Sequence, residues 1–121
     1  MCYNNSIENK KKGENMTIKL KKYCDEAIFE DNGLWLREKI FNEYSNRDNK
    51  GENIIVDFSD ISLFSAVFFE SCFSFLETNY PKIFSKIKIQ NLSKVGKKYL
   101  EIVLGEKSKI LFEDIPSEIF G

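Results

Sequence analysis

Apolar residues in this chain switch between the spacing of strands and that of helices. Ile18 and Leu20 alternate with lysines, which predicts a first strand that has one solvated face and reaches toward Tyr23. Lysines on a strand are typical of a sheet edge, because they discourage pairing with other chains. Asp31-Asn32-Gly33 is a turn signal, and Leu34 to Tyr44 then follows helical spacing. We therefore expect an edge strand, a turn and a first helix.

The middle of the chain predicts a buried strand followed by an aromatic helix. Ile54-Ile55-Val56 is a β-branched run that is apolar on both faces, as in the central strand of a covered sheet. Beyond Phe58 to Phe64, Ser65 can cap a helix, and Pro81 is expected to end it. Five aromatic residues recur at helical spacing and are expected in the core: Phe68, Phe69, Phe73, Phe75 and Tyr80. Because they occupy more than half of the circumference, the helix is either deeply buried or shared with another chain.

The last part predicts a third strand and a third helix. Ile83, Ile87 and Ile89 suggest the strand, and Ser93 then caps a helix that ends at Gly105. The apolar members expected for this helix are Val95, Tyr99, Ile102 and Val103. The segment from Ile110 to Phe120 is apolar enough to pack on the domain or on a partner. The alternating order predicts an α/β fold, with a small, mostly parallel or mixed sheet and about three crossover helices.

Length and composition are those of a single domain. The chain has 121 residues, of which 42% are apolar. The polar stretch Met1 to Asn15 is expected to be a flexible tail, which leaves one domain over residues 16–121. Three widely spaced cysteines, Cys2, Cys24 and Cys72, fit a reducing compartment. With no apolar stretch typical of a signal peptide or a membrane span, we expect a cytoplasmic protein without membrane contact.

The sequence lacks histidine, which excludes a histidine base and histidine-ligated metals. The run Lys94-Val95-Gly96-Lys97-Lys98 lacks the leading glycine and the final Ser/Thr of a phosphate loop. We therefore expect no metal, no cofactor and no enzymatic activity.

Two alternative functions remain open on the residues alone. Asp57 and Asp60 follow the central strand, where α/β sheets often hold ligands, and could serve a small carboxylate-dependent hydrolase. Capping of backbone N–H groups is the commoner role for such carboxylates. A second alternative is weak nucleic-acid binding by lysines in a stretch without acidic residues: Lys82, Lys86, Lys88, Lys94, Lys97 and Lys98. Two arginines and a pI near 5.6 favour a merely solvated face, so nucleic acid is not expected as a partner.

One segment resembles a known family. The run from Ile54 to Ile61, then Phe64-Ser65 and a helix beginning near Phe68, is similar to the core motif of STAS domains, named for sulphate transporters and anti-sigma-factor antagonists. It is closest to the STAS-like branch of unassigned function. Asn91 and the helix from Leu34 to Tyr44 also lie where that branch would have them. The resemblance implies a bacterial-type STAS-like fold with a regulatory or signalling role.

The resemblance also implies a protein partner, either an ATPase-type switch kinase or an anti-sigma-like factor. It would dock on the strand-to-helix loop, whose candidate residues are Ser59, Asp60, Ser62, Ser65 and Glu70. Anti-sigma-factor antagonists carry Asp-Ser-Ser-Gly at the helix start, with one serine phosphorylated. Here the helix start reads Ser65-Ala66-Val67-Phe68, so Val67 stands in the phospho-acceptor position. Ser65 is then the candidate phosphorylation site, although capping is its commoner role. The aromatic helix leaves a homo-oligomer as a further possibility.

Overall fold

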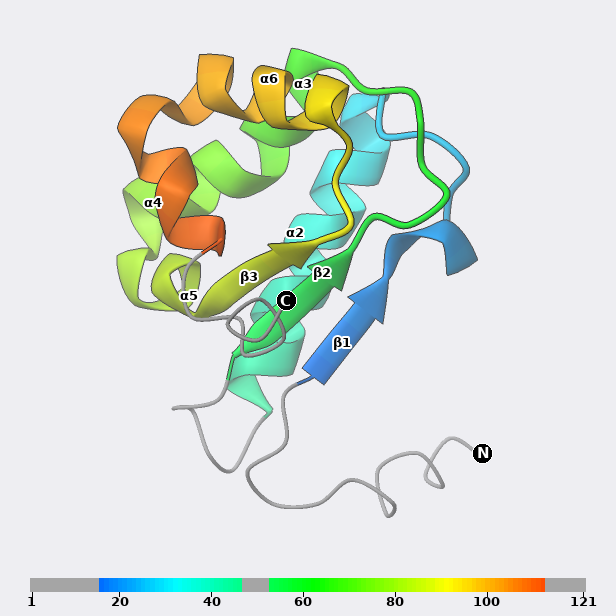
Figure 1. Ribbon diagram of the computed structural model, residues 1–121. Coiled ribbons are helices and arrows are strands. Elements are labelled where there is room, and N and C mark those ends of the chain that lie inside the picture. The colour runs from blue at the N-terminus through cyan, green and yellow to red at the C-terminus, as the bar shows by residue number, and fades with distance from the viewer. Residues whose placement is uncertain (1–15, 47–52, 113–121) are drawn as a thin grey trace, which may run out of the picture.

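The computed structural model describes residues 16–46 and 53–112 of the chain. Three parallel strands form one sheet in the order β1-β2-β3, with β1 at Met16–Lys19, β2 at Ile54–Asp57 and β3 at Ile87–Gln90 (Figure 1). Both outer strands pair with β2. This confirms the predicted α/β fold, the edge position of the first strand and the central position of the second. The predicted tail and the last nine residues lie outside the described residues.

The hydrophobic core lies on one face of the sheet. Ile18, Val56 and Ile89 occupy one register and are all buried. Helix α2 (Glu30–Ser45) crosses from β1 to β2 behind the sheet and buries Leu36 and Ile40 completely (Figure 1). The next crossover consists of α3 (Ala66–Phe69), η2 (Glu70–Ser74), α4 (Phe75–Asn79) and α5 (Pro81–Lys86). Crossover helices therefore join the strands, as a parallel sheet requires.

The opposite face of the sheet carries a buried lysine. Thr17, Ile55 and Lys88 lie in register there, and Lys88 is 4% exposed. Its Nζ donates a hydrogen bond of 2.9 Å to the carbonyl of Ile110, within η3 (Gly105–Phe112). A backbone acceptor thus partly compensates the desolvation of the ammonium group. The sequence suggested that the lysine-rich stretch forms one solvated face. That interpretation is wrong for Lys88, which is buried.

The expected turn before the first helix is wrong. Asp31-Asn32-Gly33 belongs to α2, which begins at Glu30. Gly33 serves for close packing, because a Cβ there would lie 2.0 Å from Oγ of Ser71 and 2.7 Å from the carbonyl oxygen of Phe68. The first strand is also shorter than expected. Leu20 is buried in the 3₁₀ turn η1 (Leu20–Lys22), and Tyr23 is exposed beyond it.

The aromatic helix ends just before Pro81, as predicted, and Pro81 also begins a new helix. The π-helical turn η2 interrupts the aromatic helix, which ends at Asn79, and α5 starts directly at Pro81. Proline suits the first position of a helix because its missing N–H has no partner there. Ile83 lies buried in α5, so the third strand begins at Ile87. The four-residue spacing of these two isoleucines was helical, and the assignment of Ile83 to the strand was wrong.

The aromatic helix is buried over part of its predicted core. Phe68, Phe69 and Phe73 are fully buried, as expected. Phe75 and Tyr80, also predicted to be core, are 37% and 41% exposed. The guanidinium of Arg37 lies 3.9 Å from the ring centre of Phe75, so α2 covers this end of the helix with an amphipathic side chain.

Helix α6 (Lys94–Leu104) has the predicted ends, and its expected apolar members divide between the core, where Tyr99 and Val103 pack, and the surface. The Ser93 hydroxyl accepts a hydrogen bond from the N–H of Gly96, and Gly105 ends the helix with φ +62°. Gly96 and Leu100 face the core, whereas Val95 and Ile102 are 56% and 70% exposed. Leu111 in η3 is fully buried, which confirms packing for the described part of the apolar C-terminal segment.

Candidate docking surface

The loop that follows β2, from Phe58 to Ser65, is anchored by buried side chains and a tight turn. Phe58 is fully buried, and its N–H donates to the carbonyl of Gln90 at 3.0 Å. The N–H of Ile61 then donates to the carbonyl of Phe58 at 3.1 Å. Asp60 takes a positive φ of 67° within this turn, a conformation that Asp and Asn tolerate better than most residues. Ile61 and Phe64 are buried, so the loop has a defined path.

Asp57 connects the carboxyl ends of β2 and β3. Its Oδ1 accepts hydrogen bonds of 2.9 Å from the backbone N–H of Ser59 and from Nδ2 of Asn91. Partial burial acts to raise the pKa of Asp57, but the hydrogen bonds from Asn91 and Ser59 outweigh it, so the pKa lies below its usual value. The backbone of Asn91 adopts a positive φ of 61° where its side-chain amide donates to Asp57. The interpretation of Asp57 as a capping carboxylate is thus confirmed.

The two candidate carboxylates have different surroundings. Asp57 is engaged by Asn91 and Ser59, while Asp60 is exposed in the turn. Within residues 16–46 and 53–112, no three side chains of metal-ligating type come together.

Ser65 caps α3 and also joins the loop to the segment before α2. Its hydroxyl accepts a hydrogen bond of 3.3 Å from the N–H of Phe68 and donates one of 2.5 Å to the carbonyl of Ile28. Two backbone hydrogen bonds, from the N–H of Ala27 to Leu63 and from the N–H of Ser65 to Ala27, complete the junction. The predicted cap is confirmed, and the single O–H of Ser65 is already used as a donor.

The exposed part of the loop combines polar and apolar side chains. Of the five predicted docking residues, Asp60, Ser62 and Glu70 are exposed, whereas Ser59 and Ser65 are half-buried. Leu63 and Val67 add apolar surface, with exposures of 51% and 41%. Leu63 was not among the predicted docking residues, and its outward orientation follows from the structure, which places it between exposed Ser62 and buried Phe64. We call Asp60, Ser62, Leu63, Val67 and Glu70 the loop surface.

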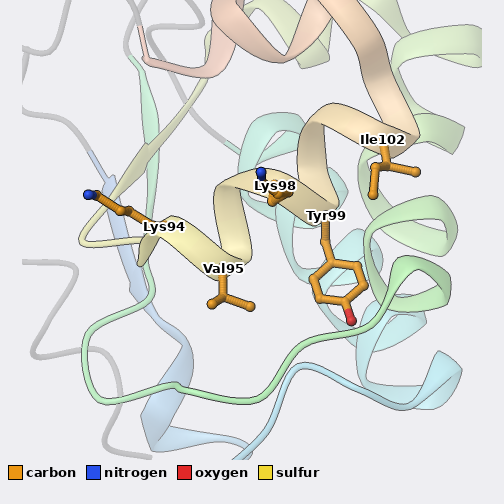
Figure 2. A pocket seen from close by; sticks show the side chains of 5 residues that line it. All are labelled: Lys94, Val95, Lys98, Tyr99 and Ile102. Atoms are coloured by element: carbon orange, nitrogen blue, oxygen red, sulfur yellow. The ribbon is translucent and has the colours of Figure 1, made fainter.

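Helix α6 places further apolar side chains beside this loop. A Cβ on Gly96 would lie 3.1 Å from the ring of Phe64, so the first turn of α6 packs directly against the loop. Val95 and Tyr99 extend from α6 toward the side on which the loop runs (Figure 2). With Ile102 they form an apolar strip flanked by Lys94 and Lys98, and these five residues line a shallow pocket of about 390 Å³. We call this set the α6 strip.

Residues 35–97 match the family described as the STAS-like domain of unknown function. The chain belongs to this family. The match runs from α2 to the first turn of α6 and includes the complete strand-to-helix loop, so the resemblance found in the sequence is confirmed. No curated protein and no solved structure matches the chain.

Two further properties of this STAS-like domain bear on its chemistry. Cys24 and Cys72 are free thiols, and Cys2 lies outside the described residues. Complete burial raises the pKa of Cys72 well above its usual value, which keeps the thiol protonated and unreactive. Among the helices that the structure describes, none has the length and apolar character needed to span a bilayer.

Proposed function

We propose that this STAS-like domain is a regulatory protein-binding module that docks a partner on the loop surface, in the manner of anti-sigma-factor antagonists. The observation that carries the proposal is the exposure of Leu63 and Val67 among polar side chains on a firmly held backbone. Such a surface suits recognition, because little conformational entropy is lost when a preorganised loop binds. The resemblance of this segment to anti-sigma-factor antagonists supports the choice of this loop.

The proposed partner is an ATPase-type switch kinase or an anti-sigma-like factor, and the proposed role is regulatory and non-enzymatic. Both follow from the resemblance to anti-sigma-factor antagonists. The proposed docking residues are those of the loop surface together with Ser59 and Ser65, which hold the backbone beneath it.

Phosphorylation of Ser65 has a specific structural consequence under this proposal. A phosphate ester has no O–H to donate, so the bond from Ser65 to the carbonyl of Ile28 would be lost. Modification would then loosen the junction between the loop and the segment before α2. Ser65 phosphorylation is therefore proposed to change docking by moving the loop as well as by adding charge.

The test compares partner recovery by charge-reversed variants. Glu70→Lys alters the loop surface, and Glu106→Lys makes the same change on η3 as a matched control. Cell extract of the source organism is passed over each immobilised domain, and the bound proteins are quantified by mass spectrometry. We expect Glu70→Lys to lose proteins that wild type and Glu106→Lys both retain. Identical recovery by all three domains, each shown to be folded by circular dichroism, would contradict docking at this surface.

An activity assay tests the non-enzymatic part of the proposal separately. Purified wild type is incubated with nucleotide and ester substrates, with and without divalent metal ions. We expect no turnover above the rate without protein. Turnover that Asp57→Asn abolishes in a folded protein would favour the hydrolase alternative.

A further inference from the structure

The α6 strip has the composition of a helix face made for a partner. Val95, Tyr99 and Ile102 recur at i, i+4 and i+7 and therefore share one side of α6. The core contacts the helix through Gly96 and Leu100, and half-buried Tyr99 also packs partly against it. Val95 and Ile102, exposed at 56% and 70%, extend from Tyr99 as apolar surface that the domain leaves uncovered.

The charged side chains that line the pocket have one sign. Lys94 and Lys98 are exposed and line the pocket together with the apolar side chains. The acidic residue of this helix, Glu101, does not line it. A ligand that places apolar side chains on the strip thus meets two ammonium groups at its rim. Carboxylates at the matching positions would gain from them, and ammonium groups would be repelled.

We infer that the α6 strip binds an acidic amphipathic helix of a partner protein, next to the loop surface. Helix-in-groove recognition uses apolar anchors at i, i+4 and i+7, which is the spacing that α6 itself presents. A second copy of this chain fits less well, because parallel pairing of two α6 helices would bring Lys94 and Lys98 of each copy together. The inference rests on the proposed function, since it names the chemistry of the partner.

The probe is a synthetic helical peptide of about 16 residues, with leucines at i, i+4 and i+7 and glutamates on both flanks. A second peptide carries lysines in place of the glutamates. Binding to the full chain is measured by fluorescence anisotropy of the labelled peptides. We expect the acidic peptide to bind about tenfold more tightly than the basic one, with a difference that shrinks as salt is added.

Variants of the full chain separate the apolar and ionic contributions. Val95→Gln with Ile102→Gln replaces the two exposed apolar anchors with a good helix former, and should weaken binding of the acidic peptide about tenfold or more. Lys94→Glu with Lys98→Glu should reverse the preference, so that the basic peptide binds better. Lys82→Glu, at an exposed position of α5, is the matched charge control and should change neither affinity. Circular dichroism confirms the fold of each variant.

Several outcomes would overturn the inference. Equal affinity for both peptides, or unchanged binding by the Val95→Gln, Ile102→Gln variant, would show that the strip does not select an acidic helix. A dimer in sedimentation that this variant abolishes would assign the strip to a second copy. A tenfold gain in peptide affinity on Ile119→Ser with Phe120→Ser would show that the chain's own carboxyl-terminal residues occupy it.

Failure of this inference is distinguishable from failure of the proposed function. If Glu70→Lys loses its partners while the acidic peptide does not bind, docking at the loop surface stands and the chemistry assigned to the α6 strip is wrong. If the peptide binds as expected but Glu70→Lys recovers every partner, the α6 strip stands and the loop surface is wrong.

Discussion

The hydroxyl of Ser65 makes two hydrogen bonds that stabilise different parts of the chain. Ser65→Ala removes the cap of α3 and also leaves the carbonyl of Ile28 without its donor. We expect a loss of about 1–2 kcal/mol in the free energy of unfolding, the usual range for a lost cap. Urea denaturation measures it. Ser62→Ala, at an exposed position of the same loop, should stay within about 0.5 kcal/mol of wild type. An equal loss in both variants would contradict the special role of Ser65.

The hydrogen bond between Asn91 and Asp57 should make a pH-dependent contribution to the stability of the fold. The folded-state pKa of Asp57 is lowered, so its stabilisation is complete above the unfolded pKa of about 3.9 and is lost as the pH falls through the folded pKa. Asn91→Gly removes the amide donor but tolerates the positive φ. The free energy of unfolding of wild type should therefore exceed that of the variant by more at pH 7 than at pH 3. Urea denaturation at the two pH values measures the difference. A difference independent of pH would show that the Asn91–Asp57 bond does not lower the pKa.

The contact between α2 and the aromatic helix depends on a missing side chain. Gly33→Ala would favour α2 by helix propensity, yet its methyl group would overlap Ser71 and approach the carbonyl of Phe68. Overpacking should prevail, with a net loss of about 1–3 kcal/mol. Adding Ser71→Gly removes the nearest clash and should recover part of the loss. Thermal or urea unfolding of the single and double variants measures both effects, and a stabilised single variant would contradict the close packing.

The order of the strands predicts a gradient of amide protection. Strand β2 has hydrogen-bonded neighbours on both sides and buries Ile54, Ile55 and Val56, whereas β1 lies at the edge. Hydrogen exchange should therefore be slowest for the amides of Ile54–Asp57 and faster in Met16–Lys19. Faster exchange in β2 than in β1 would contradict the central position of that strand.

Local patterns predicted most of the elements, because strand runs and caps depend on neighbouring residues. Ser65, Ser93 and Gly105 all mark helix ends as their residue types suggested. Gly33 was misread because its reason lies in a distant contact with Ser71, which no local pattern contains.

Local patterns also could not predict which of the two apolar faces of α6 is buried. Helix α6 carries apolar residues on two sides, and spacing alone cannot say which side the neighbouring helices will cover. The structure buries Gly96 and Leu100 and leaves Val95 and Ile102 outside. The loop was predictable as a candidate site because it follows the central strand. The exposure of Leu63 and Val67 was not predictable, because it depends on Phe64 being the side chain that folds inward.

Lys88 links the sheet to η3 and makes a prediction about the packing of the domain as a whole. Lys88→Met replaces a desolvated charge with an apolar side chain of similar length and should change stability by less than about 1.5 kcal/mol. Lys88→Glu would set a carboxylate against the carbonyl of Ile110 and should cost about 3 kcal/mol or more. Urea midpoints of the two variants decide the matter. If Lys88→Met lowers the free energy of unfolding as much as Lys88→Glu does, the ammonium group itself is required at this position.

The all-parallel sheet has a consequence for how the chain reaches its native state. Neither strand pairing can be made by a hairpin, because each crossover must first bring distant residues together. Folding should then be slower than in a helical bundle of this length. Until β2 is enclosed, its three apolar residues remain available to other chains. Lys19 of β1 thus acts early as well as late: it limits aggregation while the domain assembles, before any partner is met.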